Sequence, residues 1–172
     1  MRSIAKTLAV LLVIVVAATS LTTLAEHTSD GIILDEDFFR DDAYKSGNQG
    51  KENFYVRIDT AKHRVSVYQR RGGEWMLLGA KKCASGTNDT PTPKGQFQVI
   101  KKQETFIAND ANWNYVTYFF EDYAIHSTGE MGGKYNNKPL GKNVSHGCVR
   151  LKPEDAKWIY GHIPIGTRVD II

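Results

Sequence analysis

The clearest pattern along the chain is an alternation of apolar and polar residues that begins after residue 52. It runs through residues 53–58 and resumes over residues 64–69, and this period of two is typical of strands with one buried face. The polar residues 59–62 lie between the two runs and predict a β-hairpin. Gly72 and Gly73 predict a second turn, which leads into a third strand over residues 75–84.

The rest of the chain shows further strand patterns and one helix pattern. Pro153, followed by two acidic residues, opens a predicted helix that runs to about residue 160. Residues 129–143 are rich in Gly, Asn and Lys without periodicity, which predicts a long loop with a functional task. We therefore expect a mainly β domain over residues 53–172, a sandwich or barrel-like fold with one short C-terminal helix. Its further strands are predicted at residues 96–100, 112–120, 123–126 and 166–171.

The N-terminal segment has the pattern of an export signal. Arg2 and Lys6 precede an apolar run over residues 8–18, and small and polar residues follow to residue 25. We predict that residues 1–25 are a secretory signal peptide. The alternative is an uncleaved membrane anchor, in which Leu21 and Leu24 extend the apolar run. Either interpretation places the remainder outside the cytoplasm.

Residues 26–52 are acidic and polar and predict a linker, with a first strand around residues 32–34 as the alternative. The formal net charge is +3, but without Arg2 and Lys6 the chain carries 20 basic and 19 acidic residues. No run of Lys or Arg accompanies this small excess, so the sequence does not indicate a nucleic-acid partner.

The candidate chemistry lies in Ser145-His146-Gly147-Cys148, which holds one of the two cysteines in the chain. Glycine allows the backbone to turn tightly before the cysteine. A second histidine, His126, ends a short apolar run upstream. A thiol and a distant imidazole that the fold brings together are what thiol acyl transfer requires: the sulfur attacks a carbonyl, the imidazole moves the proton and backbone N–H groups hold the oxyanion.

These residues resemble the signature of the YkuD-type L,D-transpeptidases of bacterial cell walls. Residues 125–127, a loop, and residues 145–150 match its central part, and residues 92–97 (Thr-Pro-Lys-Gly-Gln-Phe) match its upstream element. The closing helix and residues 166–169 also fit the C-terminal end of the family. The resemblance spans about residues 53–172.

The resemblance implies a role for each matching residue. Cys148 is expected to be the nucleophile and His126 the general base and acid, with the carbonyl of Ser127 orienting its ring. His146, Gly147 and Cys148 are expected to line the oxyanion region, the last two through backbone N–H groups. The implied substrate is a stem tetrapeptide of peptidoglycan, cleaved with release of D-alanine. Transfer to an amine of a second stem gives a 3→3 cross-link, and no cofactor or metal is implied.

Ser145 and Arg150 are expected to bind substrate. The fork of Arg150 suits a carboxylate of the stem better than a lysine would. The alternative for Arg150 is a structural ion pair with Asp155 or Glu154.

Three further interpretations of the site stay open on the sequence. Cys83 and Cys148 could form a disulfide, since an exported chain with two cysteines invites that pairing. His126, His146 and Cys148 could bind zinc, with His162 or an acid as a further ligand. The same thiol could send the acyl group to water, which gives an L,D-carboxypeptidase, and a wall-binding module without turnover is the alternative from another class.

Overall fold

The structure is a computed structural model of the chain, and it describes residues 50–136 and 139–172. The predicted signal segment, residues 1–25, and all but the end of the predicted linker lie outside the described residues. The described part opens with a 3₁₀ turn, η1 (Lys51–Asn53), which leads directly into the first strand.

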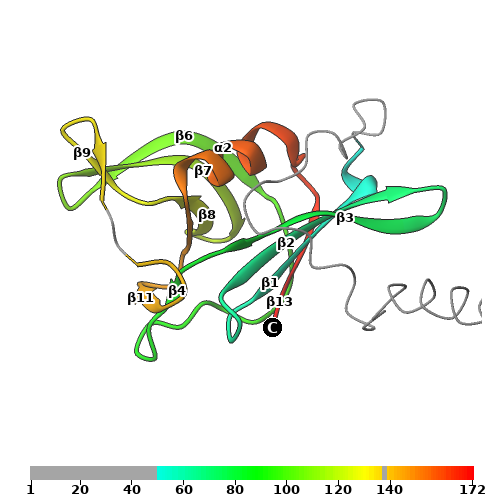
Figure 1. Cartoon of the computed structure of the whole chain (residues 1–172), viewed down its shortest axis with the longest axis horizontal. Coiled ribbons are helices and arrows are strands. Elements are labelled where there is room, and N and C mark those ends of the chain that lie inside the picture. The colour runs from blue at the N-terminus through cyan, green and yellow to red at the C-terminus, as the bar shows by residue number, and fades with distance from the viewer. Residues whose placement is uncertain (1–49, 137–138) are drawn as a thin grey trace, which may run out of the picture. The chain divides into compact units, whose positions relative to one another are not determined.

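The first sheet has five strands in the order β3-β2-β1-β13-β5 (Figure 1). The predicted hairpins are present, and β1 also pairs in parallel with the C-terminal strand β13. β13 therefore lies between β1 and β5 in the sheet. The strands are β1 (Phe54–Asp59), β2 (Arg64–Arg71), β3 (Glu74–Lys82), β5 (Gly95–Gln98) and β13 (Arg168–Ile171).

The second sheet has six strands, in the order β10-β9-β7-β8-β12 with β6 also paired to β7. β4 (Ser85–Gly86) and β11 (Asn143–Ser145) form a small parallel pair of their own. The strands of the second sheet are β6 (Lys101–Ala108), β7 (Ala111–Phe120), β8 (Tyr123–Ser127), β9 (Glu130–Met131), β10 (Lys134–Tyr135) and β12 (Val149–Leu151).

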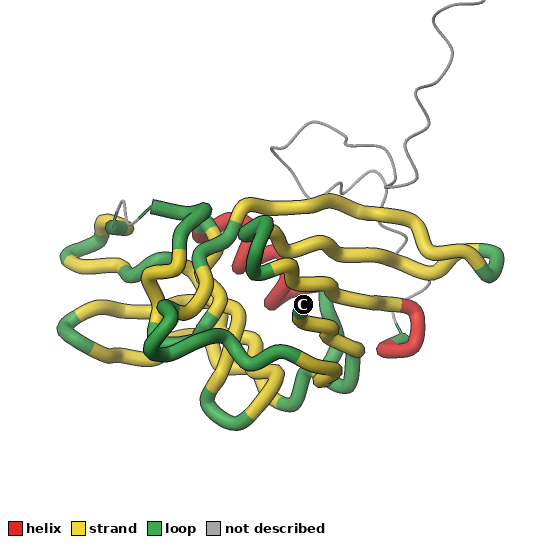
Figure 2. The backbone as a smooth tube through the Cα atoms, turned by 90° about the horizontal axis from the view of Figure 1, so that it is seen from below, coloured by secondary structure: helices red, strands yellow, loops and turns green. Residues whose placement is uncertain are grey.

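The main core lies where the inner face of the first sheet meets β7, β8 and the helix α2 (Pro153–His162). Strands dominate the backbone trace, as Figure 2 shows. The helix starts at the predicted proline, and its apolar residues Ala156 and Ile159 are fully buried in this core. Burial of such side chains is the main favourable term in folding. The prediction of a mainly β fold with one short C-terminal helix is confirmed for the described residues.

The structure adds strands that the sequence pattern did not predict. β6 was not predicted, because Lys101, Lys102 and Glu104 interrupt any apolar alternation. Its turn into β7, Asn109-Asp110, has the positive φ angles of 52° and 58° that two-residue hairpin turns require. Part of the predicted loop over 129–143 also forms the short hairpin β9–β10.

Within the described ranges, no helix is both long and apolar enough to cross a membrane.

Candidate active site

Parallel pairing of β8 with β12 joins the two parts of the predicted site. Its register sets His126 opposite Arg150 and Val149 opposite Ile125. Side chains alternate between the two faces of a sheet, so His126 and Arg150 share one face, with Cys148 just before β12 and close to the backbone of Ala124. The predicted base therefore lies on β8 and the predicted nucleophile immediately before the neighbouring strand β12, although the two are 22 positions apart in the sequence.

The imidazole of His126 is held by one hydrogen bond and two aromatic rings. Its Nδ1 lies 2.7 Å from the carbonyl oxygen of Ser127, the contact expected from the sequence. Its ring meets Phe106 and Trp113 edge-on, at centroid distances of 5.5 and 5.2 Å. A carbonyl can only accept, so Nδ1 carries the proton and Nε2 is left as the basic nitrogen.

Burial keeps the His126 imidazole neutral. Only 2% of the residue is exposed. Burial and, to a smaller extent, the positive charge of Arg150 lower its pKa to about 4, although the hydrogen bond to Ser127 acts in the opposite direction. At neutral pH the ring is therefore an unprotonated base.

The thiol of Cys148 is in an apolar setting of its own. It packs beside Val116, Tyr118 and Ala124, and its Sγ lies 3.7 Å from the carbonyl oxygen of Asp122. Burial raises the pKa of the thiol, while the backbone at Ala124 and the positive charge of Arg150 act in the opposite direction. The resting pair is thus a neutral thiol and a neutral imidazole, so the proton must move as the sulfur attacks.

The turn before Cys148 is braced from within. The hydroxyl of Ser145 donates to the carbonyl oxygen of Cys148 at 2.5 Å and accepts from the N–H of Gly147 at 3.1 Å. Ser145 is only 1% exposed, and this placement favours a structural role over the predicted contact with substrate. The Gly147 N–H, one of the two expected oxyanion donors, is likewise engaged within the turn, whereas His146 is exposed beside Cys148.

Gly147 is the residue that the turn requires at this position. Its φ is +110°, a conformation that L side chains rarely adopt. A Cβ at this position would approach the ring of Tyr123 to 2.3 Å. The tight turn predicted from the sequence is therefore also a site of close packing.

A second brace comes from Thr92, in the upstream element of the signature. Thr92 is buried, and its hydroxyl donates to the carbonyl oxygen of Gly147 at 2.8 Å while it accepts from the N–H of Gly86 at 2.9 Å. One side chain thus ties the nucleophile turn to β4. From the sequence, Thr92 was expected only as part of a family element, and this contact gives the element a structural role.

Replacing Thr92 by valine is expected to destabilise the fold by ~1–3 kcal/mol and to slow acylation of Cys148, because two buried backbone groups lose their partner. Urea unfolding and intact-mass kinetics with a carbapenem measure the two effects. Thr117→Val is the matched control, since the Thr117 hydroxyl is buried and has no hydrogen-bond partner among the described residues. Equal behaviour of the two variants would contradict the bracing role of Thr92.

Arg150 is buried against an aromatic ring rather than paired with an acid. Its guanidinium lies 4.6 Å from the centroid of Trp113, and its Nη1 donates to the carbonyl oxygen of Val144 at 3.4 Å. Its Nε is buried and has no hydrogen-bond partner in the described ranges. No ion pair joins Arg150 to Asp155 or Glu154 in the part of the chain that is described, where Asp155 instead pairs with Lys81 at 3.7 Å. The interpretation of Arg150 as half of a structural ion pair therefore finds no support.

The geometry also bears on the disulfide and zinc interpretations of the site. Cys83 and Cys148 are both free thiols, so the structure contains no disulfide between them. Burial raises the pKa of Cys83 to about 12, which makes this thiol inert. Over residues 50–136 and 139–172, no three His, Cys, Asp or Glu side chains gather as metal ligands would, so the zinc interpretation finds no ligand set there.

One ring contact of this site was not predicted. Phe106 was missed because β6 was missed, although it stands directly opposite Trp113 in the β6–β7 hairpin.

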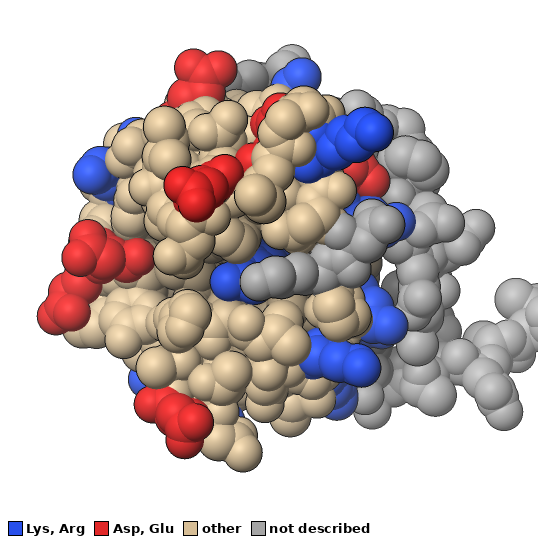
Figure 3. Space-filling view, turned by 90° about the vertical axis from the view of Figure 1, so that its left-hand side faces the viewer, with Lys and Arg blue, Asp and Glu red and all other residues tan. Residues whose placement is uncertain are grey.

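The surface at the end of the domain that carries β9 and β11 is shown in Figure 3. It is hollowed near its middle, with a basic side chain at the hollow and several acidic side chains toward the outline.

Comparison with known proteins gives consistent matches. Residues 53–171 match a family model described as YkuD, the L,D-transpeptidase catalytic domain. The chain is 32% identical over 129 residues to the putative L,D-transpeptidase YciB of Bacillus subtilis, which covers 68% of this chain and 66% of that protein. It is 35% identical over 89 residues to the probable L,D-transpeptidase ErfK/SrfK of Escherichia coli, covering 48% of this chain and 27% of that protein.

The fold is also similar to solved structures. The L,D-transpeptidase (Yku) from Stackebrandtia nassauensis superposes with a TM-score of 0.56 at 22% identity, covering 72% of this chain and 57% of the other. At that identity the likeness shows the fold alone. The family model, by contrast, covers well over half of this chain, including the strands and the turn that form the site. The chain therefore belongs to the YkuD family of L,D-transpeptidase catalytic domains.

Proposed function

We propose that the protein is a peptidoglycan L,D-transpeptidase in which Cys148 forms a thioester with a donor stem tetrapeptide. The observation that supports the proposal is the parallel register of β8 and β12: it puts the buried, neutral imidazole of His126 opposite Arg150, and the partly exposed thiol of Cys148 immediately precedes β12. These three groups supply a base, a nucleophile and a positive charge. Nothing in the reaction calls for a metal or a cofactor.

In the first step, the Sγ of Cys148 attacks the carbonyl carbon of the third residue of the stem. The thiol proton passes to the Nε2 of His126, whose other nitrogen stays bonded to Ser127. Charge that develops on the carbonyl oxygen is stabilised by the Cys148 N–H, while Arg150 binds the terminal carboxylate of the donor. The C–N bond to D-alanine then breaks, and the imidazolium gives its proton to the leaving amine.

In the second step, an amine of an acceptor stem attacks the thioester. His126 removes a proton from the attacking nitrogen, the C–S bond breaks, and the proton returns to sulfur. The product is a 3→3 cross-link between two stems. If water replaces the amine, the same steps give a shortened tripeptide, which is the carboxypeptidase alternative.

We further propose that this chemistry takes place outside the cytoplasm, where peptidoglycan is found. Residues 1–25 would direct the chain there, either as a cleaved signal peptide or as an anchor that is the sole contact with the membrane. Both the N-terminal processing and this location are open to N-terminal sequencing of the exported protein.

The test of the proposed function is the product formed from a disaccharide-tetrapeptide by the full chain. Mass spectrometry is expected to show a cross-linked dimer that has lost one D-alanine, and its yield should rise with acceptor concentration. A tripeptide alone, at every acceptor concentration, would replace transfer by hydrolysis. No product and no acylation of Cys148 would overturn the proposal.

For Arg150, we predict that Arg150→Gln lowers the rate of donor use by about 10–100-fold, the loss expected when a buried charge-assisted hydrogen bond is removed. The reason is that Arg150 binds a carboxylate of the donor. The matched substrate is a donor whose terminal carboxylate is converted to an amide. The wild type should use this donor slowly, and Arg150→Gln should use it at the same rate as the wild type. An equal loss on both donors would instead assign Arg150 to holding the turn through Val144.

A further inference from the structure

A cleft of about 580 Å³ lies on the first sheet, apart from the Cys148 site. Aromatic rings of Tyr55, Tyr68 and Trp75 and the charged side chains of Lys51, Glu52 and Arg168 contribute to its lining. These residues belong to η1, β1, β2, β3 and β13, none of which holds a residue of the proposed catalytic machinery. The volume is in the range of small-molecule sites in proteins.

The rings of the cleft lie on a face where polar side chains are expected. Tyr55 stacks on Tyr68 at a centroid distance of 5.5 Å, and Trp75 adjoins Tyr55 at 5.9 Å. Trp75 is nevertheless 46% exposed, so much of its indole meets solvent. The outer face of an antiparallel sheet is usually polar, so three adjacent rings there, two of them half-buried and one exposed, are the kind of surface on which ligands bind.

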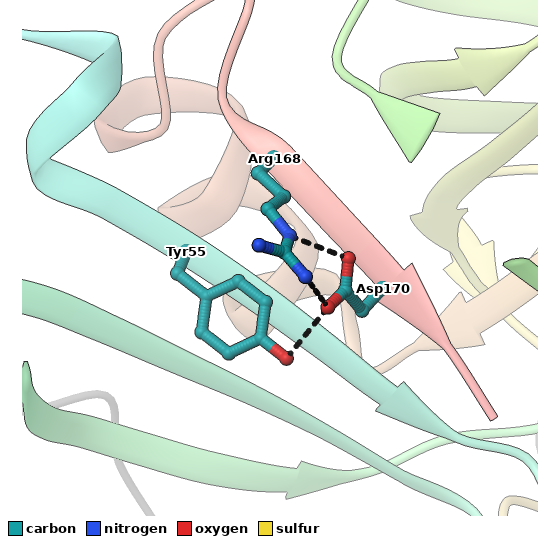
Figure 4. Close-up of polar contacts among 3 residues, drawn as sticks. All are labelled: Tyr55, Arg168 and Asp170. Atoms are coloured by element: carbon teal, nitrogen blue, oxygen red, sulfur yellow. Dashed lines mark hydrogen bonds and ion pairs between the residues drawn. The ribbon is translucent and has the colours of Figure 1, made fainter. Parts of the chain in front are cut away.

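The polar wall of the cleft is held in a fixed geometry, as Figure 4 shows. Arg168 donates through Nε and Nη2 to the two carboxylate oxygens of Asp170, at 2.8 and 2.5 Å. The Tyr55 hydroxyl donates to the same carboxylate at 3.2 Å, and the guanidinium lies over the Tyr55 ring at 5.6 Å. These contacts fix the plane of the guanidinium, and 57% of the Arg168 side chain remains exposed to meet a ligand.

We propose that this cleft binds the glycan strand of peptidoglycan, an inference that rests on the proposed function. A sugar ring has one apolar C–H face and a rim of hydroxyl and acetamido groups. The exposed indole suits the former, whereas Arg168, Lys51 and Glu52 offer donors and an acceptor to the latter. Peptidoglycan joins such sugars to the stem peptides that Cys148 is proposed to acylate, so one polymer supplies the ligands of both sites.

The experiment measures binding of peptide-free strands of alternating N-acetylglucosamine and N-acetylmuramic acid to the full chain. We expect saturable binding that weakens at least about tenfold in Trp75→Ala and in Arg168→Gln, a loss equivalent to one good contact. Ile107→Ala is the control, because Ile107 is also an exposed large apolar residue but lies on β6, outside the cleft. Acylation of Cys148 by a carbapenem should be the same in all four proteins.

Absence of binding at about 10 mM strand would overturn the proposal. This result would also follow if residues 26–49 or a second copy of the chain filled the cleft. Binding that Trp75→Ala leaves unchanged would overturn it as well. Carbapenem acylation without glycan binding would overturn this inference and leave the proposed function standing. Glycan binding without acylation would overturn the proposed function and leave the glycan site standing.

Discussion

Replacing Cys148 by alanine is expected to abolish acylation and cross-linking, lowering turnover by roughly 10⁴-fold or more, as loss of a nucleophile does in other covalent enzymes. The physical reason is that no other thiol is available: Cys83 is fully buried, and burial raises its pKa to about 12. Intact mass after incubation with a carbapenem should show one adduct in the wild type and none in the variant.

The matched control is Cys83→Ala, which removes the other sulfur from the chain. This variant should lose some stability because a small cavity replaces a buried side chain, but it should still take up one adduct. An adduct that persists in Cys148→Ala and disappears in Cys83→Ala would exchange the roles of the two cysteines. Such a result would also remove the basis of the proposed mechanism.

Replacing His126 by glutamine is expected to slow acylation by about 10²–10⁴-fold at neutral pH, the usual contribution of a general base. The change should also alter the pH profile. Because the pKa of His126 is lowered to about 4 and that of the Cys148 thiol is raised, the wild-type rate should be nearly flat from about pH 5 to 8. Below about pH 5 it should fall, as the imidazole takes up a proton.

Without the imidazole, the thiol of Cys148 can lose its proton only to solvent, and only the resulting thiolate attacks. The rate of His126→Gln should therefore rise about tenfold per pH unit up to the pKa of the thiol. Stopped-flow or mass-resolved acylation from about pH 4 to 10 distinguishes the two profiles. A bell-shaped wild-type profile centred near neutrality would instead indicate a preformed thiolate–imidazolium pair, contrary to the burial of both groups.

The sequence pattern predicted those elements that are specified by residues close together in the chain. The β1–β2 hairpin follows from strict alternation, and the β2–β3 turn follows from Gly72 and Gly73, whose φ angles are 55° and 92°. β6 escaped because it pairs with β7 alone among the described strands, and much of it stays in contact with water. Because its polar residues interrupt the alternation with apolar ones, the sequence pattern does not identify it as a strand. The Asn109-Asp110 turn was the signal that could have identified it.

In the candidate site as well, contacts between residues adjacent in sequence were predicted, whereas contacts between distant strands were not. The turn around Gly147 was predicted from the glycine itself, and the contact of His126 with the carbonyl of the next residue was expected from the family resemblance. The contact between Thr92 and Gly147, and the ring of Phe106 against His126, depend on which strands pair. Strand partners distant in sequence cannot be deduced from one chain's periodicity, so these contacts became visible only in the folded structure.

The place of β13 between β1 and β5 in the first sheet governs when the domain can fold. β5 joins this sheet through β13, and β1 pairs with β13 across most of the described chain, from Tyr55 to Arg168. Closing so long a loop is entropically costly and makes folding slow. A chain that emerges from a ribosome or crosses a membrane N-terminus first lacks this joining strand until residues 168–171 appear. Until then β5 has no partner in the first sheet, and β1 lacks one of its two neighbouring strands.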